Sequence, residues 1–132
     1  MEKFIKLKPD LVVLMAYGNI LPKKVIQCPK YGCINIHVSL LPLWRGAAPV
    51  EHALLNGDKK TGVTIFQLIN KLDAGPIISQ ASTSIDETLN KEELFKKLNN
   101  MGKQLMIKTL PDYFNNKIIL KKQNEEEATY AS

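Results

Sequence analysis

Apolar residues gather in short runs along the first half of the chain, and glycine and proline mark the breaks between them. Residues 11–16 form a continuous apolar run with adjacent β-branched side chains, which predicts a strand buried on both faces. Residues 33–37 predict a second strand, and Pro22 begins a short helix between the two. Two strands separated by a helix predict a βαβ unit with parallel strands.

The middle of the chain predicts a helix followed by a hairpin. Residues 49–56 form the helix, and Gly57 is a suitable residue to end it. Residues 62–68 alternate between apolar and polar positions, and residues 77–84 form a more polar strand after a Gly-Pro turn. These two strands are close enough in sequence to pair as a hairpin.

The last third predicts one long amphipathic helix. Asn90 is its N-cap, and Glu93 completes a capping box. An apolar stripe near the helical period follows, made of Leu94, Leu98, Met101, Leu105 and Leu110. Pro111 limits or bends the helix, and the polar residues 123–132 are expected to be loose. Together the elements predict an α/β fold: a mostly parallel sheet, flanking helices and a C-terminal amphipathic helix.

Composition narrows the function only slightly. The chain has 132 residues, 45% of them hydrophobic, which is enough for one globular domain. The formal net charge of +5 is compatible with RNA, although scattered lysines also describe an ordinary solvated surface. Cys28 and Cys33 lack metal-ligand spacing, and neither a secretory signal nor a membrane-spanning run is visible, so we expect no metal and a cytoplasmic protein.

The clearest candidate chemistry is the pair Asn35 and His37 at the end of a predicted strand. Residues two apart in a strand point to the same face, so an amide and an imidazole would project side by side. Such a pair can stabilise an oxygen that gains negative charge during acyl transfer, and the imidazole can exchange protons. Asp73 follows another predicted strand and is the leading candidate to orient the imidazole.

Structural interpretations stay open beside this one. An Asn–His pair two residues apart is common, and Asp73 is equally suited to a simple turn. His52 is interpreted as a surface residue. Trp44 and Arg45 could anchor a loop, with the cation stacked on the ring.

Several segments together resemble the methionyl-tRNA formyltransferases, within the folate-dependent formyltransferase family. The signature is Ser-Leu-Leu-Pro-Leu-Trp-Arg-Gly-Ala-Ala-Pro at residues 39–49. It is preceded by Met-Ala-Tyr-Gly-Asn-Ile-Leu-Pro at 15–22 and followed by Thr-Gly-Val-Thr-Ile at 61–65 and Leu-Asp-Ala-Gly at 72–75. The order and spacing agree, and Ala-Thr-Tyr-Ala at 128–131 is similar to the family's exit from its catalytic domain.

The resemblance implies a Rossmann-like formyltransferase fold that transfers a formyl group from 10-formyltetrahydrofolate to the amine of methionyl initiator tRNA, without a metal. Asn35, His37 and Asp73 would be the catalytic residues. The residues implied to bind the tetrahydrofolate are Ala16, Tyr17, Gly18, Asn19, Ile20, Leu21, Ser39, Leu40, Leu41, Pro42 and Leu72. Arg45 would contact the tRNA.

The chain also departs from the family pattern. The family's first strand with its Gly-containing turn and its C-terminal β-barrel have no counterpart, so residues 1–122 are expected to form an incomplete catalytic domain, with 123–132 as a polar tail. Such a sheet would expose an edge that a second chain could cover. Single positions that differ are Val38, Leu43, Ile69, Lys71 and Asn19. Lys71 would be strained if its backbone needs a positive φ.

Four functions therefore remain in view. The chain is a working formyltransferase or a working piece of one, an inactive remnant, an amino-sugar N-formyltransferase, or a basic RNA-contacting module without catalysis. Neither DNA nor a membrane is an expected partner.

Overall fold

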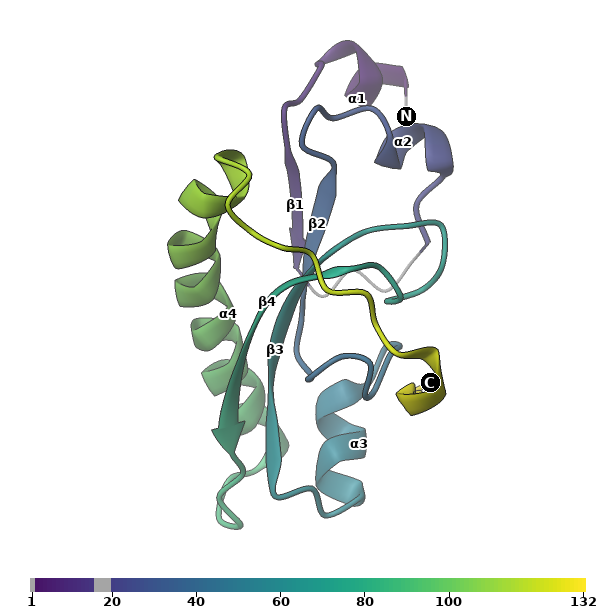
Figure 1. Ribbon diagram of the computed structural model, residues 1–132. Coiled ribbons are helices and arrows are strands. Elements are labelled where there is room, and N and C mark those ends of the chain that lie inside the picture. Colours follow the sequence, from purple (N-terminus) through teal and green to yellow (C-terminus); the bar gives the residue numbers. More distant parts are fainter. Residues whose placement is uncertain (1, 16–19) are drawn as a thin grey trace.

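The computed structural model describes residues 2–15 and 20–132 and shows a four-stranded sheet with a long helix along one face (Figure 1). In chain order the elements are α1 (Glu2–Lys6), β1 (Val12–Met15), α2 (Lys23–Ile26), β2 (Cys33–His37), α3 (Pro49–Leu55), β3 (Lys60–Gln67), β4 (Ile77–Ser84), α4 (Lys91–Phe114) and the 3₁₀ turn η1 (Glu125–Glu127). The strands and helices predicted from the sequence are therefore confirmed, with small shifts at their ends.

The sheet is mixed, so the prediction of a mostly parallel sheet is wrong. Its strand order is β1-β2-β3-β4, and only β1 and β2 pair in parallel. The connection 38–59 stays at the carboxyl end of β2, so β3 begins there and runs back, with Thr64 beside His37 and Gln67 beside Ile34. β3 and β4 then pair as the predicted antiparallel hairpin.

β1 is an edge strand and is not buried on both faces as predicted. Val12 and Leu14 pack against the apolar cluster beside α2, but Val13 is 44% exposed and Met15 is 38% exposed. An apolar run is typical of a strand covered on both sides, yet the described residues cover only one side of β1.

α4 covers one face of the sheet. Its N-terminus has the predicted capping box, in which Asn90 accepts from the Glu93 amide and the Glu93 side chain accepts from the Asn90 amide. The helix continues through Pro111 to Phe114. Gly102 allows close contact, because a Cβ at this position would lie 2.7 Å from the Ile36 side chain. Among the described helices, none is long and apolar enough to cross a membrane.

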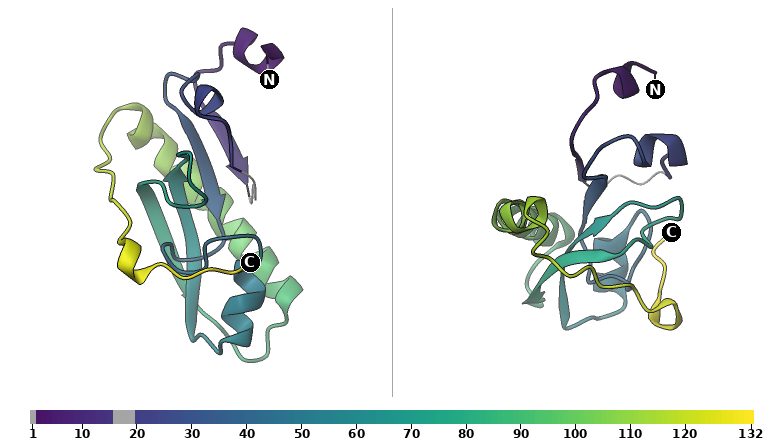
Figure 2. Two further views of the ribbon diagram at one scale, coloured as in Figure 1. Left: turned by 90° about the vertical axis from the view of Figure 1, so that its right-hand side faces the viewer. Right: turned by 45° about the horizontal axis from the view of Figure 1, so that its top comes forward.

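Residues 121–131, which we call the C-terminal strap, cross the sheet and end beside the loop before α3 (Figures 1 and 2). Lys121 exchanges two backbone hydrogen bonds with Ile77, and Ala131 donates to the Arg45 carbonyl at 2.7 Å. Ala131 is fully buried. The prediction of a loose tail is therefore wrong: polar side chains say little about a segment that is held by its backbone.

Candidate active site

The predicted pair lies at the carboxyl end of β2, on the face opposite α4. Asn35 and His37 are both buried, with exposures of 0% and 4%. Phe66 of β3 lies opposite Asn35 in the register, and Thr64 lies opposite His37. The period-two argument from the sequence therefore places both side chains on one face.

The Asn35 side chain has no hydrogen-bond partner for either its Nδ2 or its Oδ1 atom among the residues that the structure describes. Leaving such a buried group unpaired costs about 1–3 kcal/mol. A protein rarely accepts that cost without a ligand or water to satisfy the group. The Asn35 amide is thus a donor and acceptor available for a bound molecule.

His37 is held between two partners. Its Nε2 atom lies 2.8 Å from the Trp44 carbonyl oxygen, and its Nδ1 atom lies 3.9 Å from Asp73 Oδ2. Because a carbonyl only accepts, Nε2 carries the hydrogen. The Nδ1 atom faces the carboxylate at a distance that is too long for a hydrogen bond but within the range of an ion pair.

Asp73 is brought to His37 by its own loop. It is buried, its Oδ2 atom accepts a 2.7 Å hydrogen bond from the Gly46 amide, and its backbone has a φ of 50°. Asp tolerates this left-handed region better than most residues, though still at a cost. The positive φ in this loop thus falls on Asp73, and Lys71, for which strain was considered, is not among the positive-φ residues of the described chain.

The loop after β2 is shaped from β3. Thr64 Oγ1 donates to the Ser39 carbonyl at 2.7 Å and accepts from the Leu41 amide at 3.1 Å. Ser39 Oγ donates to the Leu43 carbonyl at 2.6 Å, and the Leu41–Pro42 peptide is cis. These contacts fix one conformation of residues 39–43.

The residues predicted to bind tetrahydrofolate differ in how exposed they are. Ser39, Leu41 and Leu21 are buried, whereas Leu40, Pro42 and Leu72 are partly exposed and Ile20 is 54% exposed. Ala16, Tyr17, Gly18 and Asn19 lie outside the described residues.

Arg45, predicted to contact tRNA, is not at the surface. It has 0% exposure, and its guanidinium bonds to Gln123, to the Tyr130 hydroxyl and to Glu125. The Lys71 ammonium and then the Arg45 guanidinium lower the pKa of the Glu125 carboxyl below its usual range. Gln123 is not predicted from the sequence. The one signal that pointed to its segment was the family resemblance at residues 128–131, which lie in the strap.

The neighbouring aromatic residues support the same loop. Trp44 Nε1 donates to Asp58 at 2.8 Å, and its ring lies 5.6 Å from the ring of His52. His52 is therefore partly buried against the loop, contrary to its interpretation as a surface residue. The cation stacked in this region is Arg45, and it lies over Tyr130, 5.9 Å from the ring centre, rather than over Trp44.

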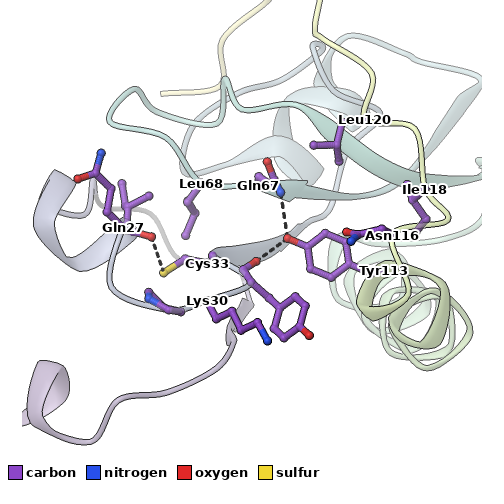
Figure 3. A pocket seen from close by; sticks show the side chains of 13 residues that line it. Gln27, Lys30, Cys33, Gln67, Leu68, Tyr113, Asn116, Ile118 and Leu120 are labelled. Carbon is purple, nitrogen blue, oxygen red and sulfur yellow. Dashed lines mark hydrogen bonds between the residues drawn. The ribbon is translucent and has the colours of Figure 1, made fainter.

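A cavity of about 430 Å³ lies at the other end of β2, between α2 and the end of α4 (Figure 3). At its wall the Tyr113 hydroxyl donates to the Tyr31 carbonyl at 2.6 Å and accepts from Gln67 at 2.9 Å. These polar groups satisfy each other. Among the described residues, no group of three or more His, Cys, Asp or Glu side chains could hold a metal.

The fold and the site together define an α/β protein in which an Asn, a His and an Asp side chain lie together at the carboxyl end of β2. A model of the family described as formyl transferase matches residues 1–110. The chain belongs to this formyl transferase family.

Relatives and solved structures agree with that family. The chain is 50% identical over 130 residues to the methionyl-tRNA formyltransferase of Bacillus subtilis (strain 168), covering 98% of this chain and 41% of that protein. It is 51% identical to the protein of that name in Ehrlichia canis (strain Jake), covering 98% and 42%. The chain thus spans about two fifths of the length of these curated relatives.

Among solved structures, the phosphoribosylglycinamide formyltransferase of Bacillus halodurans has a TM-score of 0.76 and 33% identity, covering 83% of this chain and 56% of that one. A formyltransferase of Anoxybacillus kamchatkensis, solved with a UDP-linked formamido sugar and tetrahydrofolate, has a TM-score of 0.82 and 26% identity, covering 92% and 64%.

Proposed function

We propose that this chain transfers a formyl group from 10-formyltetrahydrofolate to the amine of methionyl initiator tRNA. The observation that carries the proposal is the fully buried Asn35 amide, which has no partner among the described residues and lies beside His37, which itself faces Asp73. The identity of about 50% to proteins named methionyl-tRNA formyltransferase supports this acceptor over an amino sugar.

Asn35 and His37 suit a reaction in which a carbonyl oxygen gains negative charge. The Asn35 Nδ2 group is free to donate to that oxygen, and its burial keeps competing water away. A preorganised donor in such a site lowers the barrier without reorganisation, and removing one typically costs about 10²–10³ in rate.

His37 and Asp73 suit the movement of the proton that the attacking amine must lose. The 3.9 Å separation from His37 Nδ1 to Asp73 Oδ2 lets the carboxylate balance a positive charge on the ring. The Trp44 carbonyl fixes the ring orientation, and the Gly46 amide fixes the carboxylate.

The surroundings fit a tetrahydrofolate derivative, which would supply the formyl group. Leu40, Pro42 and Leu72 present partly exposed apolar surface next to the site, and Asn35 supplies the unmet polar group that orients a ligand. We propose that the implied residues 16–21 and 39–42 contact this donor.

The remaining parts of the proposal concern partners. The net charge of +5 suits an RNA acceptor, and two free cysteines suit the cytoplasm. A second polypeptide that adds a strand to β1 belongs to the proposal, because Val13 and Met15 are exposed there.

The test is formylation of methionyl-tRNA by the purified chain with 10-formyltetrahydrofolate, with a nucleotide-linked amino sugar as the rival acceptor. Asp73→Asn keeps an oxygen for the Gly46 amide but removes the charge, so we expect a rate loss of about a hundredfold. Asp112→Asn, at an exposed position on α4, is the matched control and should keep the wild-type rate.

Formylation of the sugar but not of the tRNA would overturn the acceptor. Equal rates for the two variants would overturn the role of Asp73. Absence of transfer to either acceptor would overturn the proposal for this chain.

A further inference from the structure

The Gln123 side chain joins two loops of the site and is buried, with 4% exposure. Its Nε2 group donates to the Asp73 carbonyl at 2.9 Å and to the Gly75 carbonyl at 2.7 Å. Its Oε1 atom accepts from Arg45 Nε at 3.2 Å and from Arg45 Nη2 at 2.9 Å. All four hydrogen-bonding positions of the amide are therefore used.

This network fixes which way the Gln123 amide points. A flipped amide would place its oxygen against two carbonyl oxygens and its NH₂ group against a guanidinium. Arg45 has no exposed surface and is held further by Tyr130 and Glu125, so it is a fixed anchor for the amide.

The Asp73 backbone needs such support. Its φ of 50° is unfavourable for a residue with a side chain, and a conformation of that kind persists only where surrounding contacts enforce it. Gln123 holds the Asp73 carbonyl, and the Gly46 amide holds its carboxylate.

The strap also sets the position of Gly46. Ala131 donates to the Arg45 carbonyl at 2.7 Å and accepts from the Ala48 amide at 2.9 Å, on either side of Gly46. A Cβ on Gly46, whose φ is 115°, would lie 2.9 Å from the Ala131 carbonyl oxygen. Both contacts that aim Asp73 at His37 therefore depend on the strap.

We propose that Gln123 is a positioning residue of the active centre, which holds Asp73 toward His37, with Arg45 as the anchor that orients it. The catalytic meaning of this proposal rests on the proposed formyl transfer. The structural part of the proposal does not depend on formyl transfer, because it predicts the Gly46–Asp73 hydrogen bond whether or not the chain is active.

The test uses Gln123→Glu in the full chain. The new carboxylate keeps the acceptor for Arg45 but cannot donate to the Asp73 and Gly75 carbonyls, so the strap stays anchored while Asp73 loses its support. Asn124→Ala is the matched control, because that exposed side chain makes its hydrogen bonds only to the turn η1, where it accepts from the Glu126 amide and donates to the Glu127 carboxylate.

Two readouts are measured. The first is the backbone amide resonance of Gly46, which a hydrogen bond to a carboxylate moves downfield; we expect it to move upfield in Gln123→Glu and to stay in Asn124→Ala. The second is formyl transfer, where we expect kcat to fall about ten- to a hundredfold with KM for the donor unchanged.

A Gln123→Glu protein that folds with an unchanged Gly46 resonance would overturn the proposal, whether or not the chain is active. A moved resonance in a chain without any transfer would contradict only the proposed function. If the variant does not fold, native-state hydrogen exchange of the wild-type chain tests the proposal instead. The amides of Gly46 and Ala131 should then exchange through the same opening. A Gly46 amide that exchanges freely while the Ala131 amide stays protected would overturn the proposal.

Discussion

The two ends of β2 use polar groups in opposite ways. At the amino end there is a cavity of about 430 Å³, yet its Tyr113 hydroxyl is satisfied by Gln67 and by the Tyr31 carbonyl. At the carboxyl end, the buried Asn35 amide has no partner among the residues that the structure describes, and Asp73 has a left-handed backbone conformation. The difference favours the carboxyl end as the proposed chemical site, because its polar groups lack partners among the described residues, and it favours a structural role for the polar groups at the cavity.

The largest expected effect is at Asn35. Asn35→Leu replaces a buried amide, for which the described part of the chain offers no partner, by an apolar group of similar size, so the free energy of unfolding should stay the same or rise. Formyl transfer should fall by about 10²–10³. Denaturant unfolding and the transfer rate measure the two effects.

The matched control for this prediction is Asn99→Leu. Asn99 of α4 also has a buried side-chain oxygen without a partner among the described residues, but it lies on the helix that covers the opposite face of the sheet. Asn99→Leu should change neither the free energy of unfolding nor the rate of formyl transfer. A large loss of stability in Asn35→Leu would show that its amide is a structural group.

Tyr113→Phe should give the reverse result at the cavity. The variant leaves the Gln67 amide and the Tyr31 carbonyl without their shared partner, so the free energy of unfolding should fall by about 1–2 kcal/mol. Formyl transfer should not change. A Tyr113→Phe variant that loses activity but keeps its stability would indicate that the chemical site is at the cavity.

The two cysteines, which both lie near the amino end of β2, should differ in reactivity. Burial, with a smaller effect of Cys28, raises the pKa of the Cys33 thiol, and this side chain lines the cavity. Because the thiolate is the reactive form, a thiol reagent at pH 8 should modify the partly exposed Cys28 at least about tenfold faster than Cys33. Mass spectrometry of partly labelled protein measures the ratio, and equal rates would show that the cavity end opens readily.

The smallest effect concerns Glu125 of the strap. Lys71 and Arg45 lower its pKa, so its ionised form stabilises the fold; the contribution is complete above the ordinary glutamate pKa of about 4.3 and is lost as the pH falls through the lower folded value. The melting temperature of wild type should slightly exceed that of Glu125→Gln at pH 7, and the two should converge in acid. Glu126→Gln is the control; a difference that does not vary with pH would contradict the assignment.

The sequence predicts what depends on local pattern. The capping box of α4, the β3–β4 hairpin and the common face of Asn35 and His37 each follow from residues close in sequence. The antiparallel direction of β3 and the edge position of β1 do not, because neighbours in the sheet decide them. Gln123 and Arg45 lie 78 residues apart, so no local pattern could show that they hold Asp73 together.

The most direct test of the site is the binding of a formyl-tetrahydrofolate to the chain, followed by the side-chain amide resonances of Asn35 and Gln67. The account predicts a saturable shift of the Asn35 amide, because this group has no partner among the described residues and lies at the proposed site, and no shift of the Gln67 amide at the cavity. A shift of Gln67 alone, or no shift of Asn35 at saturating ligand, would contradict it.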